Sequence, residues 1–163
     1  MKAPIVLDNT VLTNFALVGR DDLPHLLWPS RVCTTEAAWA EYQSGVALGK
    51  LPVKAWKTLP VIPLTEEEAT LASRLAHRLG SGERTCLALA FHRQGMLATD
   101  DKRARQVAKQ YGVSVTGTLG ILATCVEQGV LLLPEANGLL RRMIEHGYRS
   151  PVHDLRTLLP SAK

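Results

Sequence analysis

Acidic side chains recur in this sequence at positions where they could bind a divalent cation. Asp8 directly follows a short apolar run, and the pair Asp100 and Asp101 directly follows another. Glu83 lies in a glycine-flanked segment that is expected to begin a helix. Carboxylate oxygens are the ligands that hard ions such as Mg2+ prefer, and clustered carboxylates repel one another unless a cation neutralises them. The pattern therefore indicates a metal site suited to chemistry on phosphates.

The same acids have a simpler structural explanation. An Asp that follows a strand is a favoured helix N-cap, which would account for Asp8 and for Asp101. A Glu in the first turn of a helix is favoured by the helix dipole, which would account for Glu83. For one position alone the cap explains the residue better, but two Asp positions at the ends of two strands favour a site.

Glu36 and Glu41 compete for a further place in this constellation. They are five residues apart on one expected helix, so their side chains project roughly 140° apart and cannot both point at one metal ion. Glu36 lies at the helix start, where the dipole explains it. Glu41 lies a full turn further in, where no end effect explains it, and we favour Glu41 as the ligand.

Elements that could bring these acids together alternate along the chain. Short apolar runs predict strands at 5–7, 31–33, 61–62, 96–99 and 113–116. Helical patterns predict helices at 11–19, 21–28, 35–42, 65–80, 81–95, 102–111 and 117–128, and helix starts at Pro134 and at Pro151 after Ser150. Strands alternating with helices indicate an α/β fold with a parallel sheet, whose ligands bind at the carboxyl ends of the strands.

Positive charge is concentrated in the second half of the chain. Residues 1–70 contain 6 Lys/Arg and 8 Asp/Glu, whereas residues 71–163 contain 13 Lys/Arg and 7 Asp/Glu. A basic half favours a polyanionic partner such as RNA. Lys102, Arg105 and Lys109 share one helix face, and Arg84 lies on the preceding helix. These four are candidates for binding RNA phosphates, and the alternative is a solvated amphipathic face.

Length and composition limit the class of protein. A chain of 163 residues with 46% hydrophobic residues predicts one globular domain. Its three cysteines are an odd number in apolar surroundings, which argues against a disulfide framework and fits a reducing cytoplasm. The longest apolar stretch, 119–133, is too short and too interrupted to span a membrane. Exposed apolar surface on the helix expected from 118 onward would allow a homodimer.

Taken together, these segments resemble the PIN-domain nucleases, and in particular short stand-alone prokaryotic PIN proteins related to VapC-type toxins. The resemblance covers nearly the whole chain, and its combination of motifs is far more specific than any one of them. The order of the acids also matches the family's acidic quartet. The segments that carry the resemblance are Val6–Thr10, Thr35–Glu41, Gly82–Ala90, Ala98–Asp101, Asp100–Arg105 and Thr116–Leu122.

The resemblance implies a three-layer α/β/α domain with a central parallel sheet over residues 1–163, with the helices from about 134 as an appendage. It implies that Mg2+ or Mn2+ is held by four acids, and that Asp100 is a further carboxylate at the opening of the same metal site. Many relatives have Thr-x-Asp after the fourth strand, which makes Asp101 the primary ligand. Thr10 resembles the family's small hydroxyl position. Its hydroxyl would bind a water on the metal ion, or would only form a hydrogen bond within the turn. The four implied ligands are Asp8, Glu41, Glu83 and Asp101.

The implied activity is metal-dependent hydrolysis of RNA, with in-line attack by water that leaves a 5′-phosphate and a 3′-hydroxyl. A toxin of this kind would be partnered by a small antitoxin protein. The alternative is a catalytically silent PIN-like module that uses the fold to bind RNA or protein.

Overall fold

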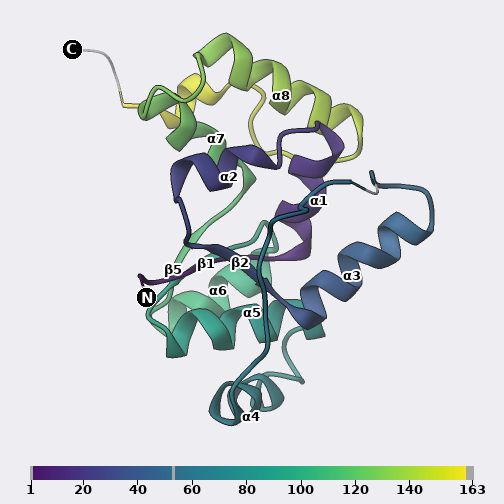
Figure 1. Ribbon diagram of the computed structural model, residues 1–163. Coiled ribbons are helices and arrows are strands. Elements are labelled where there is room, and N and C mark those ends of the chain that lie inside the picture. Colours follow the sequence, from purple (N-terminus) through teal and green to yellow (C-terminus); the bar gives the residue numbers. More distant parts are fainter. Residues whose placement is uncertain (1, 53, 161–163) are drawn as a thin grey trace.

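The computed structural model describes residues 2–52 and 54–160, and its five-stranded sheet is parallel at every pairing. The strand order across the sheet is β3-β2-β1-β4-β5 (Figure 1). The strands are β1 (Ile5–Leu7), β2 (Val32–Thr35), β3 (Val61–Ile62), β4 (Met96–Ala98) and β5 (Ser114–Thr116). Leu7 pairs with Ala98, so the chain leaves the two central strands side by side at the same edge of the sheet.

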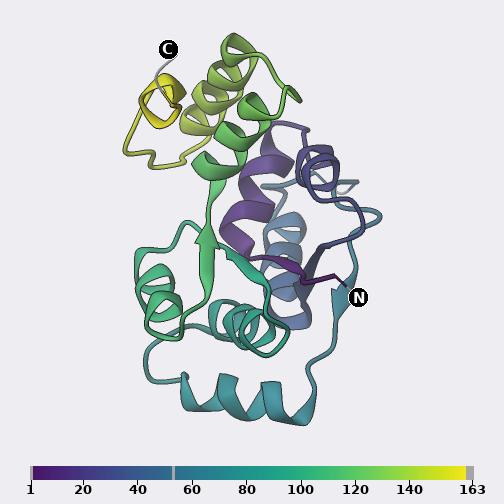
Figure 2. The same cartoon turned by 90° about the vertical axis from the view of Figure 1, so that its left-hand side faces the viewer.

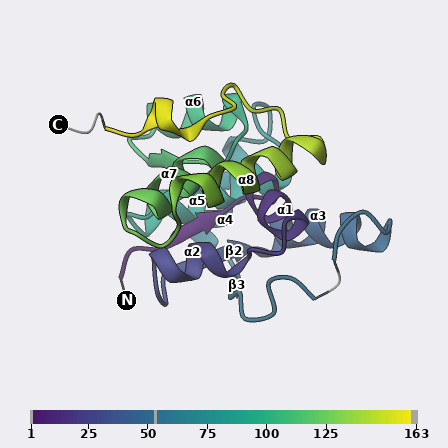
Figure 3. The same cartoon turned by 90° about the horizontal axis from the view of Figure 1, so that it is seen from above.

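Helices cover both faces of this sheet. They are α1 (Asn9–Leu17), α2 (Asp22–Leu27), α3 (Glu36–Ala47), α4 (Glu66–Arg74), α5 (Ser81–His92), α6 (Lys102–Gln110), α7 (Thr118–Glu127), α8 (Leu133–Glu145) and the 3-10 helix η1 (Leu155–Leu158). Helices α1, α2, α7 and α8 lie on one side, and α4, α5 and α6 lie on the other (Figures 1 and 2). Seen from above, α7 and α8 lie over the sheet in the same layer as α2 (Figure 3).

Central strand β1 shows why helices cover both faces of the sheet. Ile5 and Leu7 belong to the core beneath α1, α7 and α8, whereas Val6 belongs to the core beneath α4, α5 and α6. All three side chains are fully buried. A run of consecutive apolar residues is what a strand buried on both faces requires. The three-layer α/β/α fold that the sequence predicted is therefore confirmed.

Two sequence expectations about helices are wrong. Helix α4 begins with the predicted capping box of Thr65 and Glu68, but it ends at Arg74 rather than at Gly80, because the chain turns through 75–79. No helix begins at Pro151, and the next helical segment in the described chain is η1. The Ser150 hydroxyl instead accepts the Val152 N–H at 3.3 Å, which closes a local turn before η1 begins.

Helix α7 buries part of its apolar surface within the chain. Ile121, Leu122 and Cys125 are fully buried against neighbouring helices. Helix α8 contributes Leu140 and Met143 to the same core. Leu132, between the two helices, is 70% exposed, and the homodimer stays a prediction. Within residues 2–52 and 54–160, no helix is long and apolar enough to cross a bilayer.

Candidate metal site and the cavity beside it

Asp8 forms the floor of the candidate site at the carboxyl end of β1. Its side chain is 2% exposed and caps α1, accepting the Asn9 N–H at Oδ1 (2.7 Å). The Thr99 hydroxyl donates to Oδ2 at 2.8 Å from the end of β4. Buried Cys86 and Thr34 both lie against the Leu7 carbonyl and fill the space below. The carboxylate is thus fixed in orientation and largely removed from bulk water.

Glu41 and Glu83 approach from the α3 and α5 side. Glu41 Oε1 accepts the Gly82 N–H at 2.9 Å, so α3 is tied to the first turn of α5. Glu83 Oε2 accepts the Gly80 N–H at 3.1 Å and completes a capping box at the start of α5. A Cβ at Gly82 would lie 2.8 Å from Glu41 Oε1, so a larger residue at position 82 would require the Glu41 carboxylate to move.

Glu36 takes no part in this arrangement. It is an exposed residue of the first turn of α3, and Glu41 is the α3 acid whose charge is felt by both Asp8 and Glu83. The geometry therefore singles out Glu41 as the acid that α3 contributes to the candidate site.

Asp100 and Asp101 point to different neighbours, although they are adjacent in sequence. Asp101 caps α6 by accepting the Ala104 N–H at Oδ1 (2.7 Å), and its charge raises the pKa of Glu83. Asp100 instead accepts the backbone N–H of Thr118 at Oδ1 (2.7 Å) and the Thr118 hydroxyl at Oδ2 (2.5 Å). Asn14 donates to the same Oδ2 at 3.2 Å. Asp101 therefore joins the acids of the site, whereas Asp100 connects β4 to α7 and α1.

Burial, more than repulsion between the acids, disfavours the ionised forms of Asp8 and Glu83. Burial raises the pKa of Asp8 to about 7, against the opposing hydrogen bonds from Thr99 and Asn9. The pKa of Glu83 is also raised, first by burial and then by the charge of Asp101. A bound cation would favour the ionised form of each group. The donor chemistry therefore suits a divalent metal ion.

The geometry is not that of a complete coordination shell. Within the described part of the chain, no three Asp, Glu, His or Cys side chains are grouped closely enough to hold one ion. Glu41, Glu83 and Asp101 each give one oxygen to a backbone N–H. The second oxygen of each accepts no backbone hydrogen bond from the residues described, and small rotations of these side chains would be needed for them to share an ion.

In this structure Thr10 hydrogen-bonds the chain where it turns after β4. Its hydroxyl accepts the Asp100 N–H at 3.1 Å and thereby joins α1 to the end of β4. Thr99 plays the same part on the other side of the chain, because its hydroxyl contacts Asp8 and accepts the Asp101 N–H at 3.2 Å. Hydroxyls from α1 and β4 therefore set the relative positions of the acids.

The basic candidates separate into two groups. Lys102 and Lys109 are exposed on α6, as expected of side chains that could contact RNA phosphates. Arg105 is only partly exposed, because its Nη1 donates to the Thr99 carbonyl at 3.0 Å. Arg84 likewise lies partly buried on α5, with Nη1 3.4 Å from the Leu79 carbonyl.

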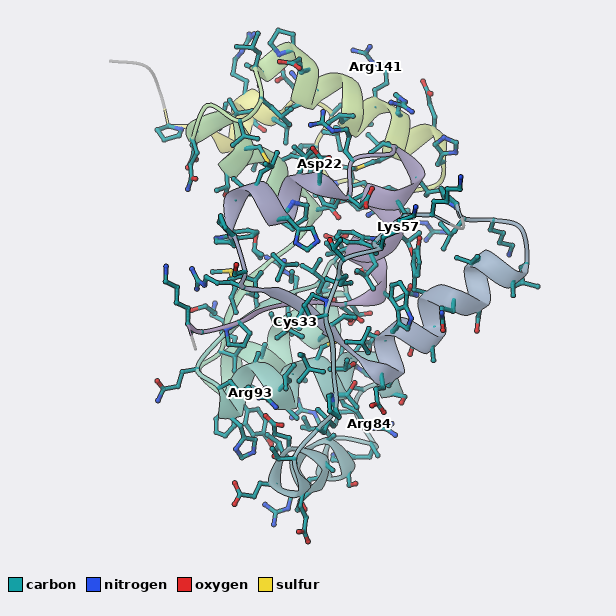
Figure 4. The ribbon with its side chains drawn as sticks, in the orientation of Figure 1. Asp22, Cys33, Lys57, Arg84, Arg93 and Arg141 are labelled. Carbon is teal, nitrogen blue, oxygen red and sulfur yellow. The ribbon has the colours of Figure 1, made fainter. Side chains whose placement is uncertain are left out.

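Arg93, at the other end of α5, is engaged in a structural ion pair. Its Nε and Nη2 each donate to a different oxygen of Glu68 at 3.0 Å, and Glu68 is 1% exposed. Figure 4 shows Arg84 and Arg93 in the lower half of the molecule, on the α5 side of the sheet. Arg93 therefore fastens α4 to α5.

A cavity of about 740 Å³ lies next to the acids, and sequence reasoning did not find it. Asp100, Asp101, Arg105, Tyr148 and Arg149 are among its lining residues. Tyr148 is a lining residue that the sequence does not single out. No local pattern marks it, because it comes from the segment after α8 and meets Asp100 only through the tertiary fold.

Acids from α3, α5 and the ends of β1 and β4 thus lie at the carboxyl edge of a parallel three-layer α/β/α domain, without forming a closed group of three ligands among the described residues. A family model described as a PIN domain matches residues 4–163, and the chain belongs to this family. PIN domains are in general nucleases, and PIN nucleases generally use divalent metal ions. A comparison with curated proteins found no match.

Proposed function

We propose that this chain is a metal-dependent endoribonuclease that hydrolyses RNA phosphodiester bonds, and that it is the toxin of a toxin–antitoxin pair. The observation that carries the nuclease proposal is the convergence of acids on Asp8 at the end of the central strands of a PIN domain. Burial of Asp8 and Glu83 beside other acids disfavours their ionised forms, and a cation bound among them would offset that cost.

Each acid would have a distinct part in holding Mg2+ or Mn2+. Asp8 would bind from the floor, in the orientation that Thr99 and Asn9 impose. Glu83 and Asp101 would bind from the rim, and Glu41 would bind directly or through water. When bound, a divalent ion supplies positive charge to the scissile phosphate and lowers the pKa of the attacking water.

The decisive test is cleavage by the Asp8→Asn protein. We expect wild-type protein to cleave at least one member of a panel of tRNA, rRNA and mRNA with Mg2+ or Mn2+, and the variant to lose about a hundredfold or more, because one anionic ligand is lost. Asp22→Asn is the matched control, since Asp22 is exposed and lies on α2 far from α5 (Figure 4). Undiminished cleavage by Asp8→Asn would remove Asp8 from the mechanism.

A catalytically silent binding module is the second candidate. The lack of a closed three-donor group among the described residues favours it. Titration calorimetry with Mn2+ distinguishes the two candidates, because a nuclease must bind the ion and a silent module need not. Saturable binding that Asp8→Asn abolishes supports the nuclease. Absence of binding together with absence of cleavage supports the module.

The toxin role rests on the likeness of the sequence motifs to short stand-alone PIN proteins, and it has its own test. Induced expression of the wild-type chain should arrest bacterial growth, whereas expression of Asp8→Asn at equal level should not. A small antitoxin protein would be the partner that restores growth. Unimpaired growth with active wild-type nuclease would refute the toxin role and leave the nuclease proposal standing.

A further inference from the structure

The cavity of about 740 Å³ adjoins the acidic site without being part of it. Its walls come from α1, from the junction between β5 and α7, and from the segment 147–151 that follows α8. Within the described chain, Asp8, Glu41 and Glu83 do not line it, whereas Asp100 and Asp101 do. Its volume falls within the range of about 300–1,000 Å³ that is usual for small-molecule sites. A ligand there would lie beside the proposed metal ligand Asp101, which forms part of the wall.

The walls offer two kinds of surface. Asn9 and Thr13 present amide and hydroxyl groups along α1, whereas Leu119 and Tyr148 present apolar area. A nucleobase has apolar faces and hydrogen-bonding edges, so it requires both kinds of surface at once. Tyr148 also packs on the core of α7 and α8, which holds its ring in a fixed position.

The charges of the cavity suit a phosphate near its mouth. Arg105 and Arg149 are the cationic side chains of the described lining. Asp100 would oppose an anion, but both of its oxygens are occupied by hydrogen bonds from Thr118 and Asn14. Arg149 is exposed, and it forms no ion pair or side-chain hydrogen bond with any residue that the structure describes. Its guanidinium is therefore available to an incoming phosphate.

We propose that this cavity binds one nucleotide of the RNA strand, next to the phosphodiester bond that the acidic site receives. Arg149 and Arg105 face its phosphate, and Leu119 and Tyr148 contact its base. The inference rests on the proposed nuclease function and deepens it. It assigns the segment after α8 a part in choosing where the strand is cut, because the base in this cavity sets the register of the strand.

The test uses the full wild-type chain in metal-free buffer, where no cleavage occurs. Adenosine and uridine 5′-monophosphates, inorganic phosphate and a short oligoribonucleotide are titrated while the backbone amide resonances are followed by NMR. We expect nucleotides to shift the glycine amides of the lining, Gly117, Gly120 and Gly147, and to leave Gly138 of α8 unmoved. Inorganic phosphate alone should bind more weakly, because it lacks the base.

Arg149→Ala should weaken binding of mononucleotide and oligoribonucleotide by about tenfold or more, as expected for loss of a charge-assisted hydrogen bond. Arg141→Ala is the matched control, since Arg141 of α8 (Figure 4) is also exposed but does not line the cavity. It should leave both affinities unchanged. Unaltered binding by Arg149→Ala, or no shift at the lining glycines, overturns the proposal. Weakened mononucleotide binding with unaltered oligoribonucleotide binding indicates a free nucleotide as ligand and overturns the RNA assignment.

Failure of this inference can be told apart from failure of the proposed function. A wild-type chain that cleaves RNA but binds no nucleotide at these glycines refutes the inference alone. A chain that binds nucleotide and oligoribonucleotide here, yet cleaves nothing with Mg2+ or Mn2+, refutes the nuclease and leaves the binding site standing.

Discussion

Replacing Asp8 with Asn should make the metal-free protein more stable at alkaline pH while abolishing its activity. Burial raises the pKa of Asp8 from 3.8 to about 7 in the folded chain. Between these values the unfolded chain loses the Asp8 proton while the folded chain keeps it, so stability falls as pH rises. Each pH unit across this window costs 1.36 kcal/mol, which gives about 4 kcal/mol at pH 8. An uncharged Asn avoids that cost.

Urea unfolding of wild-type and Asp8→Asn proteins at pH 4, 6 and 8 in metal-free buffer measures the effect. At pH 4 the two should differ little, apart from the poorer fit of an amide to the Asn9 N–H. At pH 8 the variant should gain up to about 4 kcal/mol, or about 8–16 °C in Tm for a domain of this size. Asp22→Asn, an exposed control, should shift stability by no more than about 0.5 kcal/mol at each pH.

Added Mn2+ should make the wild-type chain more stable than the Asp8→Asn variant. Ion binding selects the ionised form of Asp8, so the wild-type chain gains stability with added Mn2+ and the variant does not. A stability difference that does not change between pH 4 and pH 8 would refute the reasoning, because the effect would then not arise from the Asp8 proton. An Asp8→Asn protein less stable than wild type at pH 8 would refute it equally.

Three further substitutions test neighbouring parts of the structure. Gly82→Ala should place a methyl group against the Glu41 carboxylate and weaken Mn2+ binding by about tenfold, with helix content unchanged by circular dichroism. Arg93→Met should destabilise the chain by about 3 kcal/mol at pH 7, because Glu68 remains buried without its partner. That loss should shrink as pH falls below 4.5, since burial raises the Glu68 pKa but the bonds from Arg93 and Thr65 lower it overall. Lys102→Ala should weaken RNA binding and make its salt dependence shallower.

Each of these substitutions has a control of the same type. Gly138→Ala in α8 meets open space, so it should leave Mn2+ binding intact. Arg84→Met removes an arginine of α5 that lies outside the Glu68 pair and should cost less than Arg93→Met. Lys57→Ala removes an exposed lysine far from α6 (Figure 4) and should leave RNA binding unchanged. Equal effects of test and control in any pair would contradict the local explanation.

Local patterns in the sequence were sufficient for most of the sheet. The apolar run Ile5–Leu7 predicted β1 with its observed bounds, and Val61–Ile62 ended by Pro63 predicted edge strand β3. Both strand predictions depend only on residues that are adjacent in the chain. The end of α4 was missed because the helical pattern of apolar residues continues through 75–79, where Leu75 and Leu79 are buried in turns rather than in a helix. Periodicity reports burial, and burial does not require helical backbone.

The separate destinations of Asp100 and Asp101 could not be predicted locally. Their sequence context favours Asp101 as the acid of the site, but nothing in it identifies the partners of Asp100. Those partners are Asn14 and Thr118, which are 86 and 18 residues away in the chain. The cavity beside Asp100 was missed for the same reason, since its wall depends on the path of the chain after α8.

The sequence left two explanations for Asp8, Glu83 and Asp101, which were helix capping and metal binding. In the folded chain the two explanations are compatible. Each of the three carboxylates accepts a backbone N–H at the start of a helix. Each of those helices begins at the carboxyl edge of the sheet, so capping it directs a carboxylate toward the same region. The hydrogen bond of each cap holds its carboxylate in one orientation. An acid without such a bond would not be held there against the free-energy cost of burying its charge. Capping is therefore the means by which these acids are positioned, and the raised pKa values of Asp8 and Glu83 reflect first their burial and then the charges of the neighbouring acids.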